Sequence, residues 1–115
     1  MKVAIATNFS ADKVYAKLVA KAAKAQKRLD ARVLSDSNYW CPLDTGTLIK
    51  SSELATKIGS GQVEWRTPYA DKQYWGNFDH TKSLKPHATS RWFETAKARY
   101  EQEWQEVVRE IIRAD

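Results

Sequence analysis

The tripeptide Asp44-Thr45-Gly46 is the stretch of this sequence whose residue types suit chemistry most directly. Aspartic proteases hold their catalytic carboxylate in such a loop, and two loops meet so that the carboxylates share one proton and activate water. The tripeptide occurs once in this chain. A protease built on it would therefore be a homodimer.

The surroundings of the tripeptide favour a turn over a catalytic loop. Protease folds of this class are almost wholly β, whereas roughly half of this chain has helical periodicity, and no later segment resembles the apolar element that supports a catalytic loop. Pro42 stands two residues before Asp44. Asp44 and Thr45 can hydrogen-bond nearby backbone groups, and Gly46 permits a positive φ angle. We expect a hinge between a long helix and the sheet, with the dimeric protease as a rival.

Histidine and cysteine are the other residues with metal or nucleophile chemistry, and their spacing supports neither. His80 and His87 have no third and fourth ligand at a recognisable spacing. Cys41 is the single cysteine, so no intramolecular disulfide can form, and nothing marks a base beside it. We expect a structural thiol at Cys41, a role for His87 in capping the last helix or at an interface, and no enzyme activity, metal or cofactor.

The composition indicates a single domain spanning residues 1–115. Of its 115 residues, 43% are hydrophobic and 29% are charged, which fits one soluble domain with a modest core. The first residues are too polar for a signal peptide or a membrane span. Together with the single cysteine, this favours a cytoplasmic setting with no membrane contact.

Residues 10–37 are predicted to form a long helix. They contain neither Gly nor Pro, and apolar residues recur every three or four positions, at Val14, Leu18, Ala22, Ala25, Leu29 and Val33. Ser10 or Asp12 is expected to cap the start of this helix. Pro42 prevents its continuation.

Most of the positive charge lies on this first helix. The net charge of the chain is +5, and residues 10–38 carry seven basic and three acidic side chains. A basic face, away from the apolar stripe, consists of Lys13, Lys17, Lys21, Lys24 and Arg28. Such a face either contacts DNA phosphates, which requires charge alone, or is simply solvated. The lack of interleaved aromatic residues favours the solvated alternative.

A second amphipathic helix is predicted at the end of the chain. Its broad apolar stripe consists of Phe93, Ala96, Tyr100, Trp104, Val107 and Ile111, with Thr89 or Ser90 as the expected N-cap. Between the helices, Leu48–Ile58 and Gln62–Thr67 are predicted to pair as an antiparallel hairpin around Gly59-Ser60-Gly61.

The predicted fold class is α+β. Met1–Thr7 is expected to add an edge strand, and Ala70–Gly76 to form one helical turn. The C-terminal helix then covers the central antiparallel sheet, and the long first helix packs alongside. By periodicity three tryptophans belong to the core, at positions 65, 92 and 104. Two aromatic pairs lie beside turns and belong either to the core or to a subunit interface: Tyr39 with Trp40, and Tyr74 with Trp75.

Three motifs follow one another in an order that resembles a known family. A Pro-x-Asp-x-Gly-x-Leu element follows the first helix, a Thr-Pro-Tyr-Ala element ends a strand, and an Arg-Trp pair opens the last helix. The residues are Pro42, Asp44, Gly46 and Leu48, then Thr67, Pro68, Tyr69 and Ala70, then Arg91 and Trp92. From about residue 10 onward, the chain resembles minor capsid proteins of tailed bacteriophages and prophages of Gram-positive bacteria, a group related to neck and head-tail joining proteins.

This resemblance implies a structural protein of the virion without catalytic activity. It implies a place near the portal, at the junction of capsid and tail, within a ring-shaped assembly. The implied partners are copies of itself and phage proteins on the portal or adaptor side and on the tail side, with transient contact to packaged DNA as an additional expectation. The alternative function is that of a small basic DNA-binding protein that uses the Lys-rich first helix.

Overall fold

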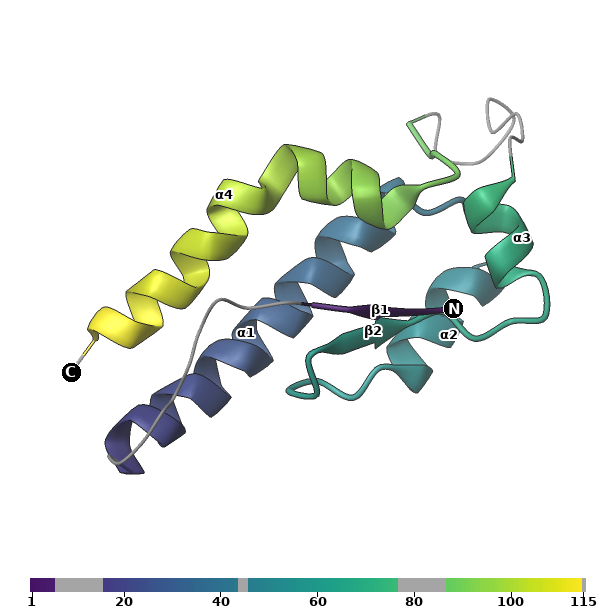
Figure 1. The fold of residues 1–115 in the computed structure, drawn as a ribbon. Helices are drawn as coiled ribbons and strands as arrows, with labels where there is room; N and C mark the ends of the chain where they lie inside the picture. Colours follow the sequence, from purple (N-terminus) through teal and green to yellow (C-terminus); the bar gives the residue numbers. More distant parts are fainter. Residues whose placement is uncertain (6–15, 44–45, 77–86, 115) are drawn as a thin grey trace.

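The computed structural model describes residues 1–5, 16–43, 46–76 and 87–114, excluding the side chains of residues 16 and 17. The elements are β1 (Lys2–Ala4), α1 (Ala16–Trp40), α2 (Thr47–Ala55), β2 (Gln62–Glu64), α3 (Ala70–Trp75) and α4 (Trp92–Arg113). The long helices α1 and α4 lie side by side, and the two strands, α2 and α3 gather near the C-terminal end of α1 (Figure 1). This arrangement confirms the predicted α+β class.

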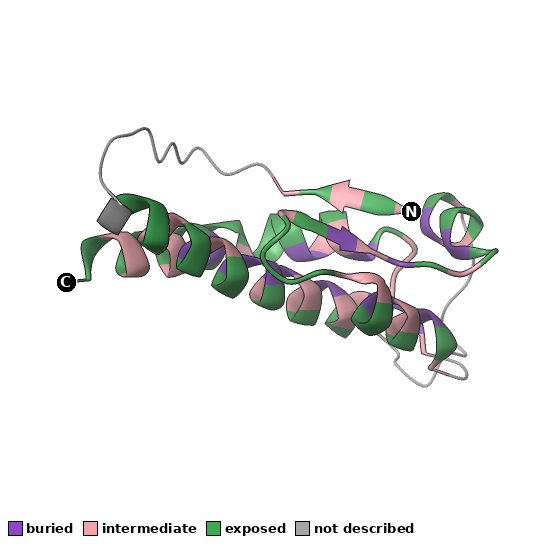
Figure 2. Ribbon diagram, turned by 90° about the horizontal axis from the view of Figure 1, so that it is seen from below, coloured by how far each residue is buried: buried purple, intermediate pink, exposed green. Residues whose placement is uncertain are grey.

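The apolar stripe predicted for the first helix is buried in the central part of α1. Ala25, Leu29 and Val33 belong to the core, and their spacing of four residues places them on one face. Leu18, nearer the start of the helix, is 38% exposed. Buried residues line the facing sides of the two long helices, while their outer sides are exposed (Figure 2). Three predicted positions lie outside the described residues: Ser10, Asp12 and Val14.

The predicted C-terminal helix is α4, and its aromatic stripe packs mainly along α1. Ala96 and Trp104 are buried, and Phe93 stacks on Trp104 with ring centroids 6.1 Å apart. At its first residue, Trp92, the helix also reaches the segment that follows β2. The last helix therefore joins the other long helix to the end of the sheet.

The N-cap expected at Thr89 or Ser90 is wrong. Helix α4 begins at Trp92, and Arg91 occupies the cap position without a capping side-chain hydrogen bond. The Thr95 hydroxyl instead donates to the backbone oxygen of Arg91 at 2.8 Å. The backbone N–H of Thr89 is used elsewhere, because it donates to the end of α1.

The strand predicted at Leu48–Ile58 is also wrong, because Thr47–Ala55 forms helix α2. Gly46 adopts φ +82°, as expected for the hinge, and its backbone oxygen accepts the N–H of Lys50 as the first helical bond. The hinge therefore leads into a helix and not into the sheet. Leu48 and Ser52, four residues apart, form the buried face of α2.

The sheet consists of β1 and β2, which pair antiparallel with Val3 opposite Val63. The N-terminal edge strand is thus confirmed for Lys2–Ala4, and its partner is the predicted second strand of the hairpin. Val63 and the following Trp65 are both fully buried. The Gly59–Gly61 turn connects α2 to β2, since the segment before it is helical.

The edge of β2 that faces away from β1 is closed by side chains from α2 and its C-cap. The Thr56 hydroxyl accepts the Glu64 N–H at 3.0 Å and donates to the Glu64 backbone oxygen at 3.4 Å. The Ser51 hydroxyl accepts the N–H of Arg66 at 3.0 Å. These hydroxyls supply hydrogen bonds that a third strand would otherwise provide.

Asp30 is a fully buried carboxylate that fixes the Gly59–Gly61 turn to α1. Its Oδ2 accepts the backbone N–H of Gly59 at 2.7 Å and of Gly61 at 2.9 Å, and its Oδ1 accepts Gln26 Nε2 at 2.6 Å. A buried charge of this kind is tolerated because each oxygen has a donor. Asp30 thereby sets the entry of the chain into β2.

Replacing Asp30 with Ala is expected to lower the free energy of unfolding by about 3 kcal/mol, because two backbone N–H groups, of Gly59 and Gly61, lose a charged acceptor. Asp30→Asn is the matched control, since it keeps one acceptor oxygen and nearly the same volume, and it is expected to lose less. Urea unfolding of both variants measures the difference. Equal and small losses for the two variants would contradict the role assigned to Asp30.

Candidate interaction surface

The C-terminal end of α1 carries an aromatic group that the chain before α4 holds in place. His87 Nε2 lies 2.8 Å from the backbone oxygen of Tyr39, and the N–H of Thr89 donates to that of Trp40 at 2.9 Å. The last carbonyls of a helix lack partners within the helix, so these contacts cap α1. His87 was expected to cap the last helix or to lie at an interface; the helix it caps is the first one.

The rings at this end of the molecule pack in a fixed geometry. The imidazole of His87 stacks on Tyr39 with centroids 4.1 Å apart and meets Trp40 edge-on at 5.6 Å. Tyr39 is nevertheless 51% exposed, whereas Trp40 is half-buried. An exposed ring that is already stacked loses little conformational freedom when it binds a partner.

The other aromatic pair is divided between core and surface. Tyr74 is 2% exposed and packs edge-on against Trp92 at 4.8 Å. Trp75 is 57% exposed, and the guanidinium carbon of Arg91 lies 5.5 Å from its ring centroid. Only Trp75 of this pair is thus available to a partner. A cation over an indole ring is favourable by about 0.5–1 kcal/mol at exposed sites.

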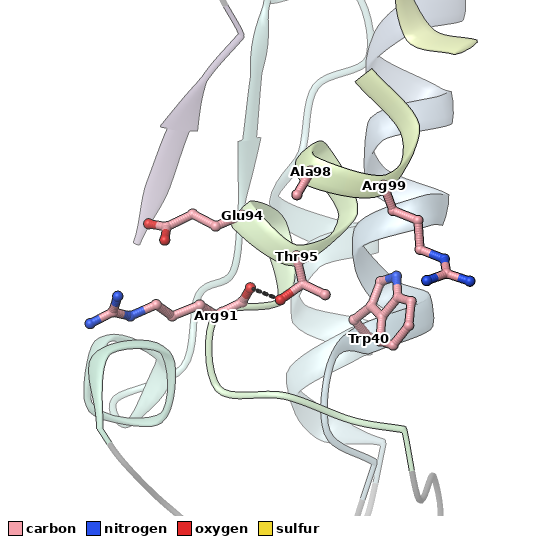
Figure 3. Close-up of a pocket in the computed structure, with 6 residues that line it drawn as sticks. All are labelled: Trp40, Arg91, Glu94, Thr95, Ala98 and Arg99. Carbon is pink, nitrogen blue, oxygen red and sulfur yellow. Dashed lines mark hydrogen bonds between the residues drawn. The ribbon is translucent and has the colours of Figure 1, made fainter. Parts of the chain in front are cut away.

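An open cleft of about 610 Å³ lies between the end of α1 and the first turns of α4. It is lined by Trp40, Arg91, Glu94, Thr95, Ala98 and Arg99. Arg91 and Arg99 project to opposite sides of α4, and Arg99 lies beside Trp40 with its guanidinium carbon 5.7 Å from the ring centroid (Figure 3). Within the described residues, neither arginine forms an ion pair.

The basic face predicted for the first helix is partly described. Lys24 and Arg28 are exposed, as is Lys27, which lies on the same side of α1. Lys21 is half-buried and donates to the backbone oxygen of Ile112 at 3.2 Å, so it fastens the end of α4 to α1. Lys13 and the side chain of Lys17 lie outside the part of the chain that the structure describes.

The family-motif residues divide into core and surface positions. Pro42, Leu48, Ala70 and Trp92 are buried, so these motif residues serve packing. Thr67 is half-buried, whereas Pro68, Tyr69 and Arg91 are exposed. Asp44 and Thr45 lie outside the described residues, and the helices α1 and α4 contradict the almost wholly β fold that the protease rival requires.

Sequence reasoning missed the polar contacts that join the elements. Asn38 accepts the indole N–H of Trp65 at 2.9 Å and donates to Ser52 Oγ at 2.9 Å, and Asp36 accepts the indole N–H of Trp104 at 2.7 Å. These polar residues lie beside the apolar stripe of the helix, and this position is the sequence signal that could have predicted buried hydrogen bonds from them. The cleft itself had no signal, because it forms between segments far apart in the sequence.

These observations define a class of protein before any comparison is made. The chain has an α+β fold whose exposed aromatic and cationic side chains suit contact with other macromolecules. Within the described ranges, no cluster of three or more His, Cys, Asp or Glu residues is placed to hold a metal ion. In the same ranges, every helix is too short or too polar to span a membrane.

Comparison with known proteins then identifies the family. The family model described as minor capsid protein matches residues 2–111, nearly the whole chain, so this protein belongs to the minor capsid protein family. This result confirms the resemblance carried by the three motifs. The protein is therefore a structural phage protein and a component of the virion. No curated protein and no solved structure matches the chain.

The buried hydroxyl of Tyr74 predicts a loss of stability at high pH. Burial raises the pKa of Tyr74 to about 12, although the N–H of Glu94, 3.3 Å from the phenolic oxygen, acts in the opposite direction. In the unfolded chain this hydroxyl has the ordinary tyrosine pKa of 10.0. Between these two pH values the folded protein therefore holds more protons, so its stability falls as the pH rises.

Tyr74→Phe lacks this ionisation and serves as the reference. The free energy of unfolding of wild type, minus that of Tyr74→Phe, is expected to be constant below about pH 9 and to decrease from about pH 10 to about pH 12. Urea titrations across this range measure the difference. A difference that does not change with pH would show that Tyr74 ionises equally easily in both states.

Proposed function

We propose that this minor capsid protein acts at the portal-proximal junction of head and tail, as a subunit of a ring-shaped neck or connector assembly. The observation that carries the proposal is the pair of exposed, braced aromatic residues, Tyr39 and Trp75. Aromatic residues of this kind dominate the binding energy of protein interfaces. Their place at one end of the molecule suits contact with a neighbouring subunit.

The proposed partners are copies of this chain and phage proteins on the portal or adaptor side and on the tail side. Family membership supports contact with other phage structural proteins, and the resemblance of the three motifs to neck and head-tail joining proteins supports the junction. Before assembly the subunit is proposed to reside in the host cytoplasm. Its role requires surface complementarity and no catalytic step.

Position in the particle is tested by labelling the protein in purified virions and imaging them by electron microscopy. The proposal expects the label at the one vertex where head and tail meet. Label distributed over the whole capsid surface would contradict the proposed position at the junction of head and tail, and the family assignment would still hold. Copy number per particle, from quantitative mass spectrometry, tests the ring because a ring requires several copies at that single vertex.

The interface residues are tested by truncation. Tyr39→Ala and Trp75→Ala are each expected to reduce incorporation of the protein into particles by at least about tenfold, which corresponds to the loss of an interface anchor. Val19→Ala is the matched control, because Val19 is similarly exposed, at 53%, near the other end of α1. All three variants should remain folded, with only a small loss of thermal stability where a ring contact is removed. Normal incorporation of both aromatic variants would contradict the proposed contact surface.

A second role, transient contact with packaged DNA, is favoured by the basic face of α1. Lys24, Lys27 and Arg28 form no ion pair within the described residues, so their charge is available to phosphate. Replacing all three with Gln is expected to reduce the slope of log binding constant against log salt by about 2 to 3 on duplex DNA. Lys50→Gln on α2 is the control. If wild type does not bind DNA at low salt, the face is a solvated one.

A further inference from the structure

Helix α2 presents an apolar side chain that its own chain leaves uncovered. Leu54 is 88% exposed, and Ile58, just beyond the helix, is 44% exposed. The opposite face of α2 is anchored in the core through Leu48, so Leu54 projects from a firmly held element. We call Leu54, the adjacent Glu53 and Lys57, which follows the C-cap of the helix, the α2 knob.

The cleft beside α4 has the complementary chemistry. The indole of Trp40 and the methyl group of Ala98 provide apolar wall, and the lining also includes the charged residues Arg91, Glu94 and Arg99. Arg99 lies beside Trp40, whereas Arg91 and Glu94 project from the other side of α4 (Figure 3). Within the described residues these arginines contact aromatic rings and no carboxylate. A guanidinium stacked on a ring still directs its N–H groups outward, where they can bind a carboxylate.

We propose that the α2 knob of one copy of this protein inserts into the cleft of the next copy. Leu54 would lie against Trp40 and Ala98, which removes apolar surface from water on both sides. Glu53 would meet Arg99, and Lys57 would meet Glu94. These two pairs bring opposite charges together, which fixes the orientation of the two copies.

A second copy is the occupant that the charges support, because the knob carries Glu53 and Lys57 and the cleft carries Arg99 and Glu94, which have the opposite signs. None of the knob residues lines the cleft. A contact between two different surfaces is heterologous. An open chain of copies therefore has a free knob at one end and a free cleft at the other, until the two ends bind each other. Closure of such a contact gives a ring. The inference therefore rests on the proposed ring function and names the surfaces that build it.

Cysteine pairing tests the contact directly. Leu54→Cys and Ala98→Cys are prepared as separate single variants, and the native Cys41 is fully buried and stays out of the reaction. Under mild oxidation an equimolar mixture of the two variants is expected to form a covalent dimer through one disulfide. Each variant alone is expected to remain monomeric on a non-reducing gel. The double variant, which carries both thiols, is expected to form a ladder of larger covalent species.

The outcomes separate the alternatives. A dimer formed by Leu54→Cys alone would mean that α2 contacts itself across a two-fold axis, which overturns the proposal. The absence of any cross-link in both the mixture and the double variant would overturn it as well. In purified particles that carry Ala98→Cys, a cross-link to a phage protein of different mass would show that the cleft receives another partner, and this too would overturn it.

A charge exchange provides an independent test. Glu53→Arg and Arg99→Glu are each expected to weaken self-association by at least about tenfold in sedimentation equilibrium, and the combination of both in one chain to restore most of it. Leu54→Glu should weaken it similarly without changing the melting temperature, because that side chain is exposed. Additive losses in the double variant would contradict the pairing. Failure of these tests, with the protein still found at the junction of wild-type particles, would reject this contact and keep the proposed function.

Discussion

The mutual burial of Trp65 and Trp92 is the contact on which the rest of this fold depends. Their rings meet at 68° with centroids 5.7 Å apart, and both side chains are 0% exposed. Trp65 follows β2 and Trp92 is the first residue of α4, so one contact fixes the sheet relative to the last helix. Tyr74, from α3, packs on the same indole of Trp92. Burial of aromatic area on this scale is a major part of the stabilisation available to a small domain.

Besides its apolar stripe, helix α1 contributes polar side chains to this arrangement. Asp30 holds the turn before β2, Asn38 holds Trp65 and α2, and Asp36 holds Trp104 of α4. Because directional hydrogen bonds tolerate few geometries, they select one placement of elements that apolar packing alone would fix less uniquely. The same helix ends in Tyr39 and Trp40, whose carbonyls are capped by the segment that leads into α4. The interaction surface is therefore built by the elements that also complete the core.

Local periodicity was enough to predict α1, α4 and β2, because Leu29, Trp104 and Val63 each repeat a pattern whose period belongs to one kind of element. It failed at α2, where a stretch rich in Ser, Thr and aliphatic residues suggested a strand. The hydroxyls of Ser51 and Ser52 instead donate to carbonyls of the preceding helical turn, at Leu48 and Ile49. The pairing of β1 with β2 joins residues about sixty positions apart in sequence, and no local pattern encodes that choice. The aromatic pairs beside turns identified Tyr39 and Trp75 as candidates, but no local pattern identified the cleft, because long-range packing creates it.

The hydroxyl of Thr56 has a consequence for how such a subunit can grow into a larger structure. By satisfying both backbone groups of Glu64, it occupies the outer edge of β2 with a side chain in place of a strand. An extended segment from another protein would have to displace that hydroxyl before it could pair there, so β-augmentation is blocked on this side. Unguarded strand edges promote indiscriminate fibrous association of subunits. Thr56 therefore hinders strand pairing at this edge of β2, so that contacts with other proteins form through side-chain surfaces and not through the backbone here.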